Sequence, residues 1–197
     1  MDVRWSLVTA PSTEPLTTAE AKAHLRVTGS DDDTPIDDIV KAAREFIETE
    51  VHRALITQTW DLFLDGFPGT DEILFPWPPL ISVTTVKYTP DADSGTTTFA
   101  SSKYIVDLAS EPGRIVLERD EVWPTDILKS VNGVEVRFTA GYGDASAVPK
   151  RLKQLAYLLV GHWYNNREAM VVGTTTKEIE LAVQTLSWGA RTFYASP

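Results

Sequence analysis

Residues 140–168 decide the predicted fold, and they read AGYGDASAVPKRLKQLAYLLVGHWYNNRE. After a glycine-rich turn, Pro149 stands in the first turn of a helix that we expect over 148–167, a position where a proline costs no hydrogen bond. One apolar stripe of this helix consists of Leu152, Leu155, Ala156, Leu159 and Trp163, and a second, neighbouring stripe consists of Tyr157, Val160 and Tyr164. A helix that is apolar around most of its circumference is buried, or is shared between a core and a partner. We therefore expect one stripe to pack within the chain and the other against another subunit.

Two further helices are predicted before residue 57. Thr17 precedes Glu20 by three residues, the spacing of a capping box, and a short helix follows that should stop at Gly29. A second helix is expected over 34–52, with Thr34 as its N-cap and Pro35 in its first turn. Its apolar residues recur at steps of three and four. Its opposite face is strongly acidic.

The pattern changes at residue 57 from helical to alternating, as in the segment TQTWDLFLD. Further strand-like segments are EILF, LISVTTVKY, TTTFA, YIVDL, RIVLE and VEVRFTA, separated by turns rich in proline and glycine. No helical pattern lies between them. The region 57–141 is therefore expected to form an antiparallel sheet or a small β-barrel.

These patterns predict an α+β protein: a helical bundle of N-terminal helices and a long C-terminal helix, with the β region inserted. The expected parts are an N-terminal helical part (1–56), the antiparallel β region (57–141), a long helix that packs on the N-terminal helices (142–172) and a C-terminal extension (173–197).

The composition excludes several classes of protein. The chain has 197 residues, no cysteine and a formal net charge of -10. Without cysteine it can form neither disulfides nor a thiolate metal site. The negative charge opposes tight binding to duplex DNA, which depends on Lys and Arg replacing counterions. Neither a secretory signal nor an apolar membrane span is expected.

The sequence offers no convincing catalytic, cofactor or metal site, and we predict a protein that is not an enzyme. The run SDDDTPIDD fails as a calcium loop because Ile36 stands where glycine is needed and Ala42 where the bidentate glutamate belongs. No phosphate-binding loop and no nucleophile elbow occur. A dispersed pair of carboxylates, as in glycosidases, stays open as an alternative. No second histidine stands at helical spacing from any of the three histidines: His24, His52 and His162.

Several segments together resemble a known family, the head-to-tail connector (adaptor) proteins of long-tailed bacteriophages and gene transfer agents. The matching segments are PLTTAEAKAHLRV, DDIVKAAREFIETEVHRALITQTW, PWPPLISVTTVKY, VEVRFTAGYG and VPKRLKQLAYLLVGHWYNNRE. They span roughly residues 5 to 172 in the family's order.

The resemblance implies a structural virion protein of the neck, assembled in the host cytoplasm. Copies would form a ring, typically of twelve, beneath the portal protein, join the capsid to a tail-side neck protein and line the channel through which DNA passes without specific binding. Helices 34–52 and 148–167 would build the ring, and residues 179–194 would reach the portal. The implied subunit interface contains Tyr157, Val160, Trp163, Tyr164 and Arg167. The implied portal contact contains Leu186, Trp188, Arg191, Phe193 and Tyr194. The expected acidic surface facing the channel contains Asp37, Asp38, Glu45 and Glu48.

The residues support this role independently of the resemblance. A ring subunit must bury one stripe of the helix in its own core and another against its neighbour, and each large side chain so buried contributes roughly 1.5–3 kcal/mol. Acidic residues facing a channel repel DNA and keep it from sticking. Two alternatives of other kinds remain: another neck component, such as a stopper, and a nucleic-acid-binding β-module.

Overall fold

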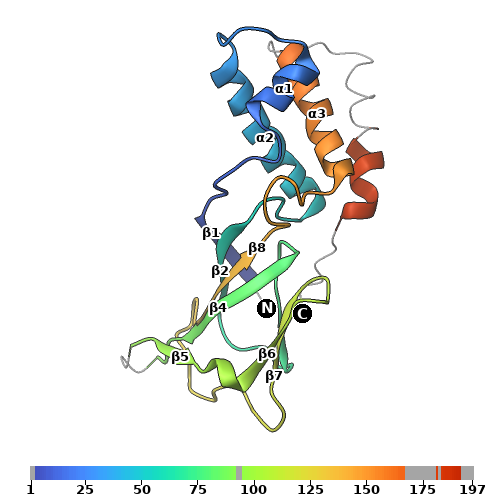
Figure 1. Cartoon of the computed structure of the whole chain (residues 1–197). Coiled ribbons are helices and arrows are strands. Elements are labelled where there is room, and N and C mark those ends of the chain that lie inside the picture. The colour runs from blue at the N-terminus through green and yellow to red at the C-terminus, as the bar shows by residue number, and fades with distance from the viewer. Residues whose placement is uncertain (1–2, 92–94, 167–180, 182, 192–197) are drawn as a thin grey trace. The chain divides into compact units, whose positions relative to one another are not determined.

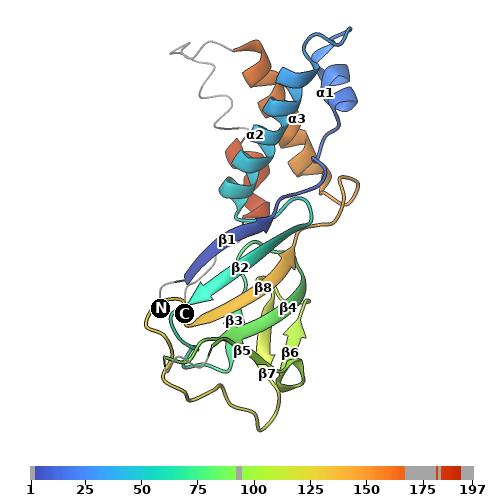
Figure 2. The same cartoon turned by 90° about the vertical axis from the view of Figure 1, so that its left-hand side faces the viewer.

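The computed structural model describes residues 3–91, 95–166, 181 and 183–191, and these form two compact units. Unit 1 consists of the described residues of Met1–Pro11 together with Thr57–Gly141. Unit 2 consists of the described residues of Ser12–Ile56 and Tyr142–Arg191. Figures 1 and 2 show unit 1 as the strands and unit 2 as the helices.

Unit 1 contains two antiparallel sheets (Figure 2). The five-stranded sheet has the order β1-β2-β8-β4-β5, and the three-stranded sheet has the order β3-β7-β6. The strands are β1 (Val3–Thr9), β2 (Gln58–Leu64), β3 (Glu72–Leu74), β4 (Leu80–Tyr88), β5 (Thr97–Phe99), β6 (Tyr104–Asp107), β7 (Arg114–Leu117) and β8 (Val134–Ala140), and a 3-10 turn, η1 (Ser101–Lys103), joins β5 to β6.

The two sheets of unit 1 enclose their own core. Phe138 of β8 and Phe75, which follows β3, are both fully buried, with ring centroids 5.0 Å apart. Every second residue of β8 is buried, which is the alternation expected of a strand with one face in a core. Unit 1 is thus a small two-layered β structure.

Close approach between the sheets requires a glycine at one position. A Cβ added to Gly113, directly before β7, would lie 2.4 Å from the Cβ of Leu80 in β4. Leu80 itself is almost fully buried. The side chain that is missing at Gly113 is what lets the three-stranded sheet reach the five-stranded one.

Unit 2 packs helices α1 (Thr18–Leu25), α2 (Asp33–Val51) and α3 (Lys150–Asn165) around an apolar core, and a 3-10 turn, η2 (Trp188–Ala190), joins them. The capping box at the start of α1 is present: Thr17 Oγ1 accepts from the backbone N–H of Glu20, and the Glu20 carboxylate accepts from the backbone N–H of Thr17. The core contains the apolar stripe of α2 and residues from both stripes of α3. Its fully buried members include Ile36, Ala43, Ile47, Val51, Leu152, Leu155 and Val160.

Several predicted helix ends are wrong. Helix α3 spans Lys150–Asn165 rather than 148–167, and Pro149, which was expected in its first turn, is its N-cap. Helix α1 ends with Arg26 in the left-handed region (φ 58°) rather than at Gly29. The N-cap of α2 is Asp32, not Thr34, because the helix begins two residues earlier than predicted and Pro35 still lies in its first turn. The side chain of Asp32 does not cap this helix and instead accepts a hydrogen bond from the Tyr164 hydroxyl at 2.5 Å.

The predicted fold class, a helical bundle with a long C-terminal helix and an inserted sheet, is wrong. Eight strands in two sheets dominate the part of the chain that the structure describes, and α3 is only 16 residues long. Residues 3–9, predicted to lead into the helices, form β1 and pair with β2. The sheets also bury their own aromatic core, so they are not an insertion that depends on a helical frame.

Candidate functional interface of the helical unit

Aromatic side chains gather on α2 and α3 at the edge of the core of unit 2. Trp163 packs edge-on against Phe46 of α2, with centroids 5.9 Å apart and an interplanar angle of 87°. Phe46 is 41% exposed, and Trp163 is half-buried. Tyr157 lies against the His24 ring at 5.1 Å. An apolar surface is therefore left partly in water along these two helices.

The predicted interface residues divide into two groups. Tyr157, Trp163 and Tyr164 are partly buried and pack against the core while still meeting solvent. Burial raises the pKa of the Tyr157 hydroxyl, and the nearby Glu20 carboxylate raises it further. Val160 is fully buried within the unit, so it is not a contact residue. Arg167 lies outside the described residues.

A turn near the C-terminus is tied to both long helices. The guanidinium of Arg53, just after α2, donates to the carbonyl oxygen of Ala190 at 2.6 Å and to the Tyr142 hydroxyl at 3.1 Å. Arg151 of α3 donates to the carbonyl oxygen of Gly189, and Arg191 forms an ion pair with Glu50. These contacts hold η2 in one place on the unit (Figure 1).

The predicted portal-contact residues differ in how far their side chains are exposed. Trp188 is 77% exposed, the most exposed tryptophan of the described chain, and Leu181 is 64% exposed. Leu186 instead packs against the core, and Arg191 is engaged with Glu50. Phe193 and Tyr194 lie outside the described residues.

The acidic face of α2 keeps three of its four predicted members. Asp37, Asp38 and Glu45 are exposed. The prediction for Glu48 is wrong, because this residue is only 6% exposed, and its carboxylate accepts from Arg44 at 2.8 Å and from the backbone N–H of Leu55 at 2.8 Å. Glu48 follows the acidic pattern in sequence but lies on the core side of the helix.

Arg44 is the centre of a buried ionic network that the sequence reading missed. It is 4% exposed and contacts Glu48, Glu14 at 2.7 Å and Glu45 at 3.2 Å. Burial has the largest single effect on the pKa of Arg44 and lowers it. The carboxylates of Glu48 and Glu14 together outweigh burial, so the pKa of Arg44 is raised. The only sequence signal was a lone arginine four residues before a glutamate on an apolar helix.

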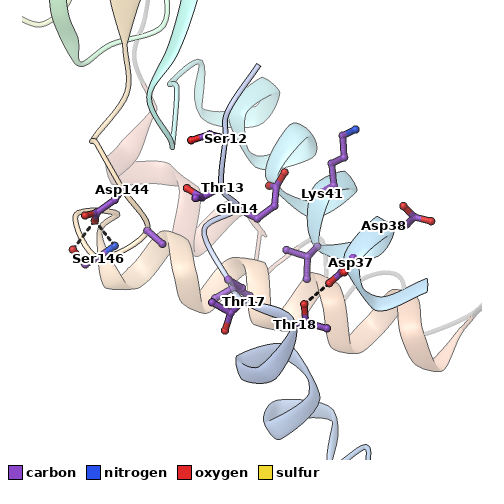
Figure 3. A pocket seen from close by; sticks show the side chains of 13 residues that line it. Ser12, Thr13, Glu14, Thr17, Thr18, Asp37, Asp38, Lys41, Asp144 and Ser146 are labelled. Carbon is purple, nitrogen blue, oxygen red and sulfur yellow. Dashed lines mark hydrogen bonds between the residues drawn. The ribbon is translucent and has the colours of Figure 1, made fainter. Parts of the chain in front are cut away.

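An open pocket of about 630 Å³ lies beside the acidic face of α2 (Figure 3). Its polar residues bond to one another: the Thr18 hydroxyl donates to Asp37 at 2.6 Å, and the backbone and side chain of Ser146 donate to Asp144 at 2.8 and 2.6 Å. The Ser146 hydroxyl, and then the backbone N–H groups, lower the pKa of Asp144. A general acid needs a raised pKa, so Asp144 is not suited to that role.

Neither a metal site nor a membrane helix emerges from the described part of the chain. No group of three or more histidine, aspartate or glutamate side chains there is arranged to hold a metal ion. None of its helices is long and apolar enough to cross a membrane.

The model of the head completion protein family matches residues 14–184, and the chain belongs to that family. The resemblance drawn from the sequence is thereby confirmed, and so is the prediction of a structural, head-to-tail connecting role. A comparison with curated proteins finds no relative.

Solved structures of gene transfer agent (GTA) particles contain similar chains. A chain in the neck of an empty GTA particle computed with C6 symmetry is 28% identical, with a TM-score of 0.79, over 98% of this chain and 97% of that one. A chain in the virion of a native gene transfer agent is 26% identical, with a TM-score of 0.77 and the same coverage. A chain in the neck of a native GTA particle computed with C12 symmetry is 26% identical, with a TM-score of 0.76 and the same coverage.

Proposed function

We propose that copies of this protein form a ring in the neck of a virion, beneath the portal protein, and join the capsid to the tail-side neck proteins without catalysing a reaction. The observation that carries this proposal is the likeness to neck chains along 98% of the sequence. Two of those structures were computed with cyclic symmetry, which supports several copies arranged around one axis. The protein would act in the virion, after assembly in the host cytoplasm.

The aromatic surface of α2 and α3 would form the contact between neighbouring subunits of this ring. Tyr157, Trp163 and Tyr164 combine partial exposure with contact to the core, as interface aromatics do, and the exposed Phe46 packs against Trp163. Their rings are held by neighbours, so little side-chain freedom remains to be lost on association. Arg167, in the segment after α3, stays a predicted member of this contact.

The anchored turn η2 would carry the contact to the portal protein. Trp188 combines high exposure with a backbone fixed by Arg53 and Arg151. A large aromatic side chain on a fixed backbone is typical of a residue that dominates binding energy. Leu181 extends the exposed apolar surface, and Phe193 and Tyr194 stay predicted members.

The acidic face of α2 would line the channel for DNA. Asp37, Asp38 and Glu45 are exposed on one helix, and the whole chain carries a charge of -10. Repeated around a ring, such charges repel phosphates and let DNA pass without binding.

Native mass spectrometry of the full chain, alone and mixed with the portal protein of the same particle, tests the proposal. We expect about twelve copies on each portal assembly. A protein that stays monomeric and ignores the portal at every concentration would contradict the proposal. Binding only to a preformed portal and adaptor assembly would assign it instead to the tail side of the neck, as a stopper.

Two variants separate the two contacts. Trp163→Ala should lower the number of copies on each portal, and Trp188→Ala should weaken attachment of all copies together. Val122→Ala is the matched control, because Val122 is 70% exposed in unit 1 and belongs to neither surface. Thermal unfolding of each variant alone shows whether Trp163→Ala acts through folding.

A further inference from the structure

The β structure of unit 1 is open on two opposite sides. Trp77, which follows β3, stacks on Trp60 of β2 at 5.3 Å and meets Trp5 of β1 edge-on at 6.1 Å. At the other side, Phe99 of β5 stacks on Tyr104 of β6 at 6.1 Å. One side of the unit therefore ends in β1 and β3, and the other in β5 and β6 (Figure 2).

On the first side, strand β1 presents an open edge with apolar side chains; we name this the β1 edge. β1 pairs with β2 along one side only, and alternate N–H and C=O groups on its other side have no strand beside them among the described residues. Trp5 and Leu7 pair with Leu62 and Trp60, so they lie on the sheet face that buries Phe138. Yet they are 42% and 45% exposed. The core face of the sheet thus continues to the edge, where Trp77 covers it only in part.

On the second side, strand β6 presents a corresponding β6 edge. β6 pairs only with β7 among the described strands. Ile105 is 52% exposed, and Leu108, directly after the strand, is 51% exposed. An open strand edge with exposed apolar residues is a surface that natural proteins normally protect with charges or cover with a partner.

We infer that, in the ring, the β1 edge of one copy pairs with the β6 edge of the next, joining the sheets of neighbouring subunits. This inference rests on the proposed ring. A second copy is the occupant that the two edges fit, because an open strand edge is satisfied by another strand edge, and the chain carries different edges on opposite sides. The other two edge strands, β3 and β5, have only three residues each. A contact between two different surfaces, repeated by a rotation that returns to its starting point, closes a ring. A symmetric contact between two β1 edges would instead stop at a dimer and leave both β6 edges in water.

Chemical crosslinking tests this pairing, because the natural chain contains no cysteine. Ser6→Cys places a thiol on the β1 edge, and Ile105→Cys places one on the β6 edge, both at exposed positions. The full-length double variant, assembled on the portal protein, would be treated with a short bismaleimide, which tolerates an unknown register. We expect a ladder of covalent oligomers up to the closed ring. Each single variant should stay uncrosslinked.

The outcomes separate this inference from the proposed function. A complete ring in native mass spectrometry, with no ladder from the double variant, overturns the edge pairing and leaves the ring standing. A covalent dimer from Ser6→Cys alone shows symmetric pairing and also overturns it, as does a crosslink from residue 6 to the portal protein. If no ring forms at all, both proposals fail.

A second set of variants tests the same contact without crosslinking. Lysine at an open edge opposes strand pairing, so Leu7→Lys and Ile105→Lys should each reduce complete rings at least tenfold while the monomer stays folded. Ile127→Lys is the matched control: Ile127 is 82% exposed in the loop between β7 and β8, on neither edge. Equal assembly of all three variants would contradict the inference. Hydrogen exchange gives an independent readout, because β1 amides protected already in the monomer would show that the chain itself covers this edge.

Discussion

The two units are stabilised by different means. Unit 2 buries a charged group: Arg44, 4% exposed, is surrounded by the carboxylates of Glu14 and Glu48 inside a helical core. Unit 1 keeps its arginines nearer to water: Arg114 bonds Asp107 and Glu72 on the surface, and Arg137, whose side chain is 40% exposed, binds the buried Asp61 at 2.8 Å. Its interior contains aromatic rings such as Phe138. Similar arginine–carboxylate contacts therefore differ in how much they matter for stability, according to how deeply they are buried. Removing one member of the ion pair inside unit 2 leaves the other charge buried without water or a counterion. On the surface of unit 1, water solvates the charge that remains.

The largest expected effect tests whether the two cores are separate. Phe138→Ala should cost unit 1 about 3–5 kcal/mol, since it removes a fully buried ring, and Leu155→Ala should cost unit 2 about 2–5 kcal/mol. Hydrogen exchange followed by mass spectrometry would report each unit through its own peptides. Each variant should lose protection in its own unit only. Equal loss of protection in both units would show that they unfold together and that their cores are not independent.

The buried ionic network supplies the next test. Arg44→Ala should destabilise unit 2 by about 3–5 kcal/mol, because Glu48 would be left buried without its cation. The surface counterpart Arg114→Ala should change stability little. Urea unfolding of both variants measures the difference. Equal effects would mean that burial does not distinguish the two arginines.

Close packing of the two sheets predicts a smaller effect. Gly113→Ala should cost about 1–3 kcal/mol, because the new Cβ meets Leu80 at 2.4 Å and the sheets must shift. Gly66→Ala is the control, since nothing lies within 4 Å of its added Cβ. A Gly113→Ala protein as stable as the natural one would mean that the sheets can move apart without loss.

The smallest effect concerns the capping box of α1. Thr17→Ala should cost about 1 kcal/mol at pH 7. The backbone N–H of Thr17, and then its hydroxyl, lower the pKa of Glu20 from its ordinary value of 4.5. This contribution is therefore present above pH 4.5 and is lost as the pH falls through the lowered pKa. Glu20→Gln should make unit 2 less sensitive to pH in this range, as measured by thermal unfolding, and an unchanged pH profile would contradict the assignment.

Local patterns in the sequence predicted the helices well and the sheets only in part. The Thr17 cap was found because both partners lie within one turn. Strands β4 and β8 begin and end where their alternation predicts, over Leu80–Tyr88 and Val134–Ala140. Strand β1 was missed although Val3, Trp5 and Leu7 alternate with polar residues, because a short N-terminal segment gives no sign of the strand it will pair with.

Local patterns also failed to predict which residues of the candidate surfaces are exposed. Glu48 and Val160 follow the acidic and apolar patterns of residues that are exposed, yet both are buried. Both residues belong to the side of their helix that packs where α2 and α3 cross, and no local pattern contains that crossing. The exposure of Trp188 and the edges of the sheets likewise follow from contacts between distant segments.

The sequence by itself determined the capping box of α1, most strands, most of the acidic helix face and the resemblance to connector proteins, since each depends on residues close together in the chain. The tertiary structure decided that β1 completes a five-stranded sheet, that a second sheet covers it, and which charged and aromatic side chains remain in water. The physical reason is that burial and strand pairing depend on partners from far along the chain. The β1 residues pair with residues 50 (Thr9 with Thr59) to 61 (Val3 with Leu64) positions away, and no local period specifies such a partner.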